Sequence, residues 1–170
     1  SDAPAPAHPY GLAHLACEQL LSDDERVWIV RPSNMFGVPA HADLGDQARL
    51  LFVDLCKQAA SGTMKMQNDG HSYRAFLPFP DAFAAVRLLL QNSNKTVRLF
   101  NLASGKSMRL DETAKLIQMA AEVPPTLEFG SAQDAFRCPF TIRNERLRKL
   151  GWQPTASLSE EAAKMVQFFL

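Results

Sequence analysis

The chain has 170 residues, 18 basic and 18 acidic side chains, and 46% hydrophobic residues. This length can bury a substantial core, and the zero net charge excludes the basic excess that a nucleic-acid or anionic-membrane binder needs. No apolar run reaches the roughly 18 residues of a membrane span, so we expect neither nucleic acid nor membrane as a partner. The three cysteines are too widely spaced for a disulfide framework, which favours a cytoplasmic protein with small, buried thiols.

Apolar periodicity and turn residues predict alternating helices and strands. The first half of the chain is expected to form helix 11–21, strand 27–30, loop 31–37, helix 44–61, strands 64–66 and 73–79, and helix 81–92. The second half is expected to form strand 97–102, helix 107–123, strand 126–129, helix 144–150 and a helix that opens at 157. Asp81 is predicted to be an N-cap, and Gly151 to close the helix before it. This alternation indicates an α/β fold with a parallel sheet.

Several common enzyme motifs are missing from the chain. No two glycines lie closer than eight positions, whereas a dinucleotide fingerprint or a P-loop needs clustered glycines where the backbone approaches phosphate. The four histidines have no cysteine or carboxylate at metal-ligand spacing, so no metal site is predicted. Taken alone, the chain has the motifs of no complete enzyme.

A family resemblance emerges from five short segments that follow one another in a fixed order. They resemble motifs of the extended short-chain dehydrogenases, the NAD-dependent sugar-nucleotide epimerase/dehydratase family. The segments are 9–18 (Pro-Tyr-Gly-x-Ser-Lys-x-x-x-Glu in the family), 31–37 (Arg-Pro-x-Asn-x-Tyr-Gly), 74–81 (Arg-Asp-Phe-Ile/Val with a later Asp), 100–105 (Tyr-Asn-Ile/Leu-Gly-Ser-Gly) and 150–154 (Leu-Gly-Trp-x-Pro). Together they span nearly the whole chain, and they indicate the family without identifying the member.

The resemblance implies the C-terminal part of a Rossmann-like fold, with residues 1–170 as one substrate-binding portion. Residues 10–37 and 97–123 would belong to the dinucleotide-type sheet, and residues 38–96 and 124–170 to a small α/β substrate lobe. The cofactor-binding half would precede this chain, supplied by the same gene or by a second chain. The resemblance also implies NAD or NADP as cofactor, a nucleoside-diphosphate sugar as substrate, and a homodimer formed through helix 11–21.

The family's active-site tyrosine and lysine correspond to Tyr10 and His14. In the family, the phenol exchanges a proton with the sugar while hydride moves to or from the nicotinamide. A phenol titrates near pH 10, and the lysine one turn later lowers its pKa and holds the nicotinamide ribose. A histidine titrates near pH 6.5 and is shorter. The resemblance therefore implies that Tyr10 and His14 are catalytic and cofactor-binding, with Pro32 beside the cofactor, in a weak or inactive redox site. A functional protonated His14 or a rewired mechanism is the alternative.

Three further residues are implied to bind substrate. Arg74 and Asn34 would contact the diphosphate, because a guanidinium fork holds two phosphate oxygens. The alternatives are a surface ion pair of Arg74 with Asp81 or Asp69, and a role for Asn34 in shaping its loop. Arg137 would make a second phosphate or sugar contact, or would be a solvated side chain.

The chain departs from the family pattern at several polar positions. Ala75 replaces the aspartate that follows the arginine, Pro78-Phe79 replaces His/Tyr-Val, and Arg143 replaces a late aspartate. We therefore weigh two functions. The first is the sugar-nucleotide-binding half of an NAD(P)-dependent epimerase, dehydratase or reductase. The second is a non-catalytic interaction or ligand-binding module derived from the same fold.

Overall fold

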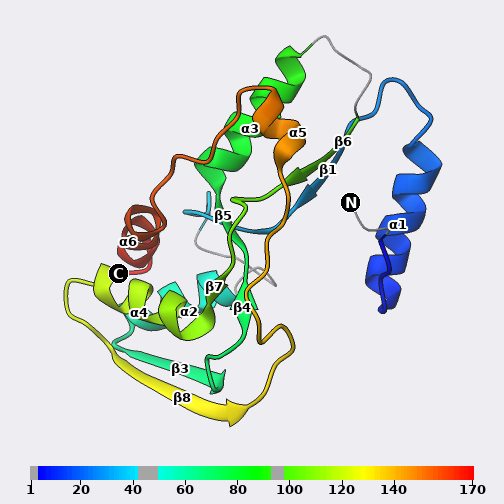
Figure 1. Cartoon of the computed structure of the whole chain (residues 1–170). Coiled ribbons are helices and arrows are strands. Elements are labelled where there is room, and N and C mark those ends of the chain that lie inside the picture. The colour runs from blue at the N-terminus through cyan, green and yellow to red at the C-terminus, as the bar shows by residue number, and fades with distance from the viewer. Residues whose placement is uncertain (1–3, 42–49, 93–97) are drawn as a thin grey trace.

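The computed structural model describes residues 4–41, 50–92 and 98–170 (Figure 1). Helices and strands alternate, which confirms the α/β class. Their order is α1 (Pro9–Leu21), β1 (Ile29–Pro32), β2 (Asn34–Phe36), α2 (Leu51–Ala60), β3 (Thr63–Asn68), β4 (Tyr73–Arg74), β5 (Phe76–Pro78), α3 (Phe79–Gln91), β6 (Leu99–Leu102), β7 (Met108–Arg109), α4 (Leu110–Ala120), β8 (Thr126–Ala132), α5 (Glu145–Lys149) and α6 (Leu158–Phe168). The predicted starts of helix 44–61 and strand 97–102 lie outside the described residues.

The strands of the described chain form four two-stranded ribbons, three of them parallel. β1 pairs with β6, and Val30 lies opposite Phe100. β2 pairs with β5, and β3 with β8, whereas β4 and β7 run antiparallel. The parallel pairing of β1 with β6 confirms the arrangement expected from their apolar sequences.

Two hydrophobic cores hold the elements together. The first lies among α2, α4 and α6, and its side chains include Phe52, Leu55, Met64, Ile117 and Met165. The second joins α3 to β6 and to the turn after α5, and its side chains include Leu77, Leu89, Phe100, Leu147 and Trp152. In Figure 1, α2, α4 and α6 gather beside the β3–β8 ribbon, and α1 stands apart at the edge of the molecule. The division into a dinucleotide-type sheet and a substrate lobe remains a prediction.

The role of Asp81 differs from the predicted N-cap. Helix α3 begins two residues earlier, after Pro78, because Pro80 can occupy a first-turn position where no N–H is needed. Asp81 is buried, and its Oδ1 accepts hydrogen bonds from the backbone N–H groups of Thr155 (2.8 Å) and Ala156 (3.2 Å). Its carboxylate therefore fixes the segment that follows α5 instead of capping α3.

Other predicted boundaries also shift. Strand β1 begins at Ile29, two residues after the predicted start. The predicted loop 31–37 contains the end of β1 and all of β2, because both find parallel partners far along the chain. The helix predicted from 107 begins at Leu110, since Met108 and Arg109 form β7. Gly151 follows α5 with φ 91°, as expected for a residue that closes a helix.

The expectation of three buried thiols is wrong for two of them. Cys56 is buried in the first core, and this burial raises the pKa of its thiol to about 12. Cys17 and Cys138 are exposed, because their segments cover no core. All three are free of disulfides. No helix among the described residues is long and apolar enough to cross a membrane.

Candidate functional site

Tyr10 and His14 lie one turn apart on α1 and contact each other. Their ring centroids are 4.4 Å apart, and the rings meet edge to face at 63°. Tyr10 is 78% exposed, and no residue of α1 is buried. The helix thus presents both rings at the surface, where a phenol and an imidazole are available to a ligand.

An ion pair joins the first two motif segments. The Arg31 Nε atom donates to both Glu18 carboxylate oxygens at 2.9 Å, and Nη2 also contacts Glu18. The carboxylate beside it raises the pKa of the Arg31 guanidinium. The pair connects α1 to β1, and it therefore holds the Tyr10–His14 helix next to the carboxyl end of β1.

The segment that follows β1 carries Pro32 and Asn34. Pro32 is exposed and lies opposite Leu102 in the parallel register. The backbone N–H of Asn34 and its side-chain Nδ2 both donate to the carbonyl of Ala75, at 3.1 and 3.0 Å. Asn34 thus ties β2 to the residue directly after Arg74. This contact supplies the loop-shaping role, and a contact to substrate remains a prediction.

Arg74 pairs with Asp134, which corrects the ion pair with Asp81 or Asp69 that the sequence suggested. Its Nη2 lies 3.6 Å from the Asp134 carboxylate, and its Nη1 donates to the Tyr73 carbonyl at 2.9 Å. Its guanidinium carbon stands 5.6 Å from the centre of the Phe136 ring. The Arg74 guanidinium therefore makes a cation–π contact with the Phe136 ring.

Arg137 is not a free, solvated side chain. Its Nη2 donates to Asp69 Oδ2 at 2.8 Å and lies 3.3 Å from His71 Nδ1. The Arg137 guanidinium holds the pKa of the Asp69 carboxyl below its usual value. The pairing became possible because the turn after β3 and the segment after β8 lie side by side.

Phe136 links the two arginines. It has φ 61°, which is rare for a bulky residue, and it is 65% exposed. Its carbonyl accepts a hydrogen bond from the Tyr73 N–H at 2.8 Å, which ties residues 134–137 to β4. We call the resulting group the arginine site; it consists of Asn34, Asp69, Arg74, Asp134, Phe136 and Arg137.

The structure groups some of the predicted site residues and leaves others separate. Asn34 donates to the carbonyl of Ala75, next to Arg74. Arg74 in turn pairs with Asp134, three residues before Arg137 in the chain. None of the contacts in the described parts of the chain joins Tyr10 or His14 to the arginine site. Sequence reasoning missed Asp134 and Phe136 as site residues. Their only signal is their position just before Arg137.

A sequence model described as the NAD dependent epimerase/dehydratase family matches residues 1–103, more than half of the chain. The chain belongs to this family. This chain has the tyrosine of the family pattern at position 10, and it has His14 where that pattern has lysine.

Curated and solved relatives agree with this assignment. The chain is 26% identical over 167 residues to the dTDP-L-rhamnose 4-epimerase of Burkholderia thailandensis, covering 91% of this chain and 44% of that protein. The fold resembles RMD from Pseudomonas aeruginosa complexed with NADPH, with TM-score 0.81, 21% identity, and coverage of 98% of this chain and 58% of that one. It also resembles the UDP-glucose 4-epimerase of Thermotoga maritima with UDP-glucose, with TM-score 0.78, 21% identity, and coverage of 98% and 54%.

The chain therefore spans about half the length of the proteins it matches. The match covers almost all of this chain, so its fold corresponds to a Rossmann-like part of these longer relatives.

Proposed function

We propose that this chain is the sugar-nucleotide-binding half of an NAD(P)-dependent epimerase, dehydratase or reductase. The observation that carries the proposal is the arginine site, where Arg74 lies over the exposed Phe136 ring and the next residue, Arg137, pairs with Asp69. Two guanidinium groups suit the two phosphates of a nucleoside diphosphate, because each can hold two oxygens at once. Asp69 and Asp134 orient the arginines before the ligand arrives.

Binding of UDP-glucose to this chain, measured by isothermal titration calorimetry, tests the proposal. We expect Arg74→Gln and Arg137→Gln each to weaken binding by about tenfold, since each removes a charge-assisted contact to phosphate. Arg26→Gln is the matched control, because within residues 4–41, 50–92 and 98–170 Arg26 pairs only with Asp24, two residues before it. Equal affinity for all four proteins would contradict the proposal.

The cofactor part of the proposal rests on the exposed Tyr10 and His14 rings, with Pro32 nearby in the family pattern. These residues fit the nicotinamide end of NAD or NADP, which would accept or supply hydride when bound. Tyr10 would donate or accept the proton at its phenolic oxygen. A protonated His14, whose ring centroid lies 4.4 Å from that of Tyr10, would stabilise the phenolate. The rest of the cofactor would contact the half of the protein that precedes this chain.

His14→Lys tests the role of this position in a protein that carries both halves. A lysine is charged at pH 7, whereas an ordinary histidine is mostly neutral. We therefore expect the variant to turn over the sugar nucleotide faster. Nicotinamide absorbance measures this turnover. His8→Lys, on the residue before α1, is the control. No gain with His14→Lys would contradict the proposed weakness of histidine.

The second candidate function is ligand binding without turnover. It is favoured by His14, which stands in the lysine position. UDP-glucose binding combined with no turnover in either the wild type or His14→Lys would support it.

We also propose a homodimer formed through α1 and a cytoplasmic location. The dimer is supported by the exposed leucines of α1, and the location by the three free thiols.

A further inference from the structure

We propose that a pocket separate from the arginine site binds a small organic anion with an apolar body. The pocket has a volume of 440 Å³, a size typical of small-molecule sites. It contains none of the residues of the arginine site, nor Tyr10, His14 or Pro32. This inference goes beyond the proposed function and does not depend on it.

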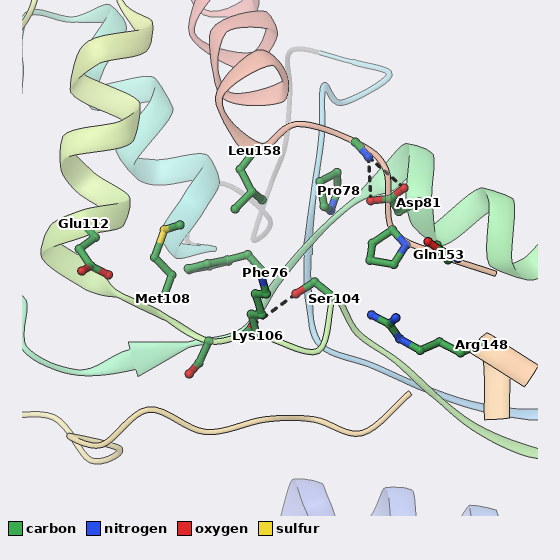
Figure 2. A pocket seen from close by; sticks show the side chains of 13 residues that line it. Phe76, Pro78, Asp81, Ser104, Lys106, Met108, Glu112, Arg148, Gln153 and Leu158 are labelled. Atoms are coloured by element: carbon green, nitrogen blue, oxygen red, sulfur yellow. Dashed lines mark hydrogen bonds between the residues drawn. The ribbon is translucent and has the colours of Figure 1, made fainter. Parts of the chain in front are cut away.

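The pocket lies beside β5 and the turn after β6. Phe76 and Pro78 are the first and last residues of β5, and Ser104 comes two residues after the end of β6. Figure 2 shows these residues below the start of α6, with Glu112 of α4 on one side and Arg148 of α5 on the other. The pocket therefore lies where side chains from β5, α4, α5, α6 and the turn after β6 come together.

Much of the wall is apolar. Phe76 and Pro78 are buried, and Met108, Pro154 and Leu158 complete the apolar surface. Pro78 stands where the family pattern noted above has a histidine or tyrosine. The smaller proline ring, with no polar atom, leaves this side of the pocket apolar. Such a wall favours a ligand with a ring or a hydrocarbon body.

Two cations on the lining have no acidic partner. Among the described residues, Lys106 Nζ forms no hydrogen bond or ion pair. The same is true of the two Nη atoms of Arg148, whose Nε donates to Asn144 Oδ1 at 2.9 Å. Figure 2 shows the Arg148 side chain extending from α5 toward Ser104. In contrast, Arg31, Arg74 and Arg137 each pair with a carboxylate.

The two acids on the lining are already engaged. Asp81 accepts hydrogen bonds from the Thr155 and Ala156 N–H groups, and Glu112 accepts one from the Arg109 N–H at 3.1 Å. Neither forms an ion pair with Lys106 or Arg148. An incoming carboxylate or phosphate would thus find two cations with unused donors beside an apolar wall.

Phenyl phosphate is a suitable probe, because it combines an aromatic ring with an anion, and benzyl alcohol is its neutral counterpart. We would titrate each into the ¹⁵N-labelled chain and follow backbone amide shifts by NMR. We expect phenyl phosphate to shift amides of residues 104–108 and 156–158, and benzyl alcohol to bind about tenfold more weakly. No saturable shift there, or equal affinity for the two compounds, would overturn the proposal.

Substitutions of Lys106 and Arg148 test whether these two cations bind the phosphate of phenyl phosphate. We expect Lys106→Gln and Arg148→Gln each to weaken phenyl phosphate binding by about fivefold to tenfold. Both side chains are exposed, so the substitutions should leave the dispersed amide spectrum intact. Lys149→Gln is the matched control, since Lys149 is exposed and lies outside the lining. An equal loss in the control, or no loss in either variant, would overturn the assignment.

Arg74→Gln separates this site from the arginine site. It should weaken UDP-glucose binding and leave phenyl phosphate shifts at 104–108 unchanged. If phenyl phosphate instead shifts only amides near Arg74 and Arg137, the second site is wrong while the proposed function stands.

Discussion

Asp81 shows how one buried carboxylate can support two distant segments. Its side chain accepts the Thr155 and Ala156 N–H groups, and its backbone carbonyl accepts the Trp152 Nε1–H at 3.1 Å. These hydrogen bonds hold the Leu-Gly-Trp segment against the start of α3. Asp81 is the aspartate that follows the arginine motif in the family pattern, and in this chain its hydrogen bonds stabilise the fold.

Asp81→Ala should lower the free energy of unfolding by about 2 kcal/mol, because it leaves buried N–H donors without an acceptor. Asp81→Asn should cost less, since one side-chain oxygen still accepts. Urea unfolding followed by circular dichroism measures both. Glu25→Ala, at an exposed position, is the control. A loss with Asp81→Ala no larger than in this control would show that the hydrogen bonds contribute little.

The Asp69–Arg137 pair makes a prediction about pH. The folded-state pKa of Asp69 lies below the ordinary value of 3.8, chiefly because Arg137 donates hydrogen bonds to it. The pair therefore adds stability above about pH 4, and this contribution is lost as the pH falls through the folded-state pKa. Arg137→Gln should raise the pKa of Asp69 toward 3.8. Carbon-13 NMR titration of the carboxyl measures this shift, and Arg26→Gln should leave it unchanged.

At the scale of elements, the β3–β8 ribbon depends on a glycine. A Cβ atom added to Gly130 would lie 2.1 Å from the carbonyl oxygen of Gln67, which belongs to the partner strand. The ribbon passes this point with a shift of register between Met66 and Asn68. The close approach of the two backbones therefore requires the absence of a side chain.

Gly130→Ala should lower the free energy of unfolding by about 2 kcal/mol, because the strands must move apart to admit the methyl group. Thermal unfolding monitored by circular dichroism tests this. The neighbouring Ser131→Ala, at an exposed position of the same strand, should change stability little. If the two variants had the same melting temperature, the β3–β8 ribbon would be able to admit the methyl group without loss of stability.

At the scale of the whole molecule, the helix α1 has little cover from the rest of the described chain. It buries no residue, and Tyr10, Leu12, Leu20 and Leu21 are all exposed on it. The Glu18–Arg31 pair links it to β1. A helix of this kind usually has an apolar face covered by another element. The proposed homodimer would supply that cover.

We expect the chain to self-associate with rising concentration in sedimentation velocity, and Leu20→Lys to shift it toward the monomer. Leu20 is 82% exposed, so the substitution removes apolar surface without disturbing a core. Met119→Lys is the matched control, because Met119 is also 82% exposed but lies on α4. A clean monomer at high concentration would contradict the dimer.

The sequence by itself determined the α/β class, the order of most elements and the family. These features depend on local periodicity and on short motifs, which are visible in neighbouring residues. The end of α1 at Leu21 and the positive φ of Gly151 were predictable in this way. Asn34, Arg74 and Arg137 were also named from the sequence, whereas Asp134 and Phe136 were not.

The partners of these residues were decided only by the tertiary structure. Arg137 and Asp69 are 68 residues apart in the chain, and Asp81 and Thr155 are 74 apart. No local pattern specifies which acid meets which arginine, because that depends on how β4, β8 and the 134–137 segment come together. The pocket with Lys106 and Arg148 arises for the same reason, since its walls come from five separate stretches of the chain.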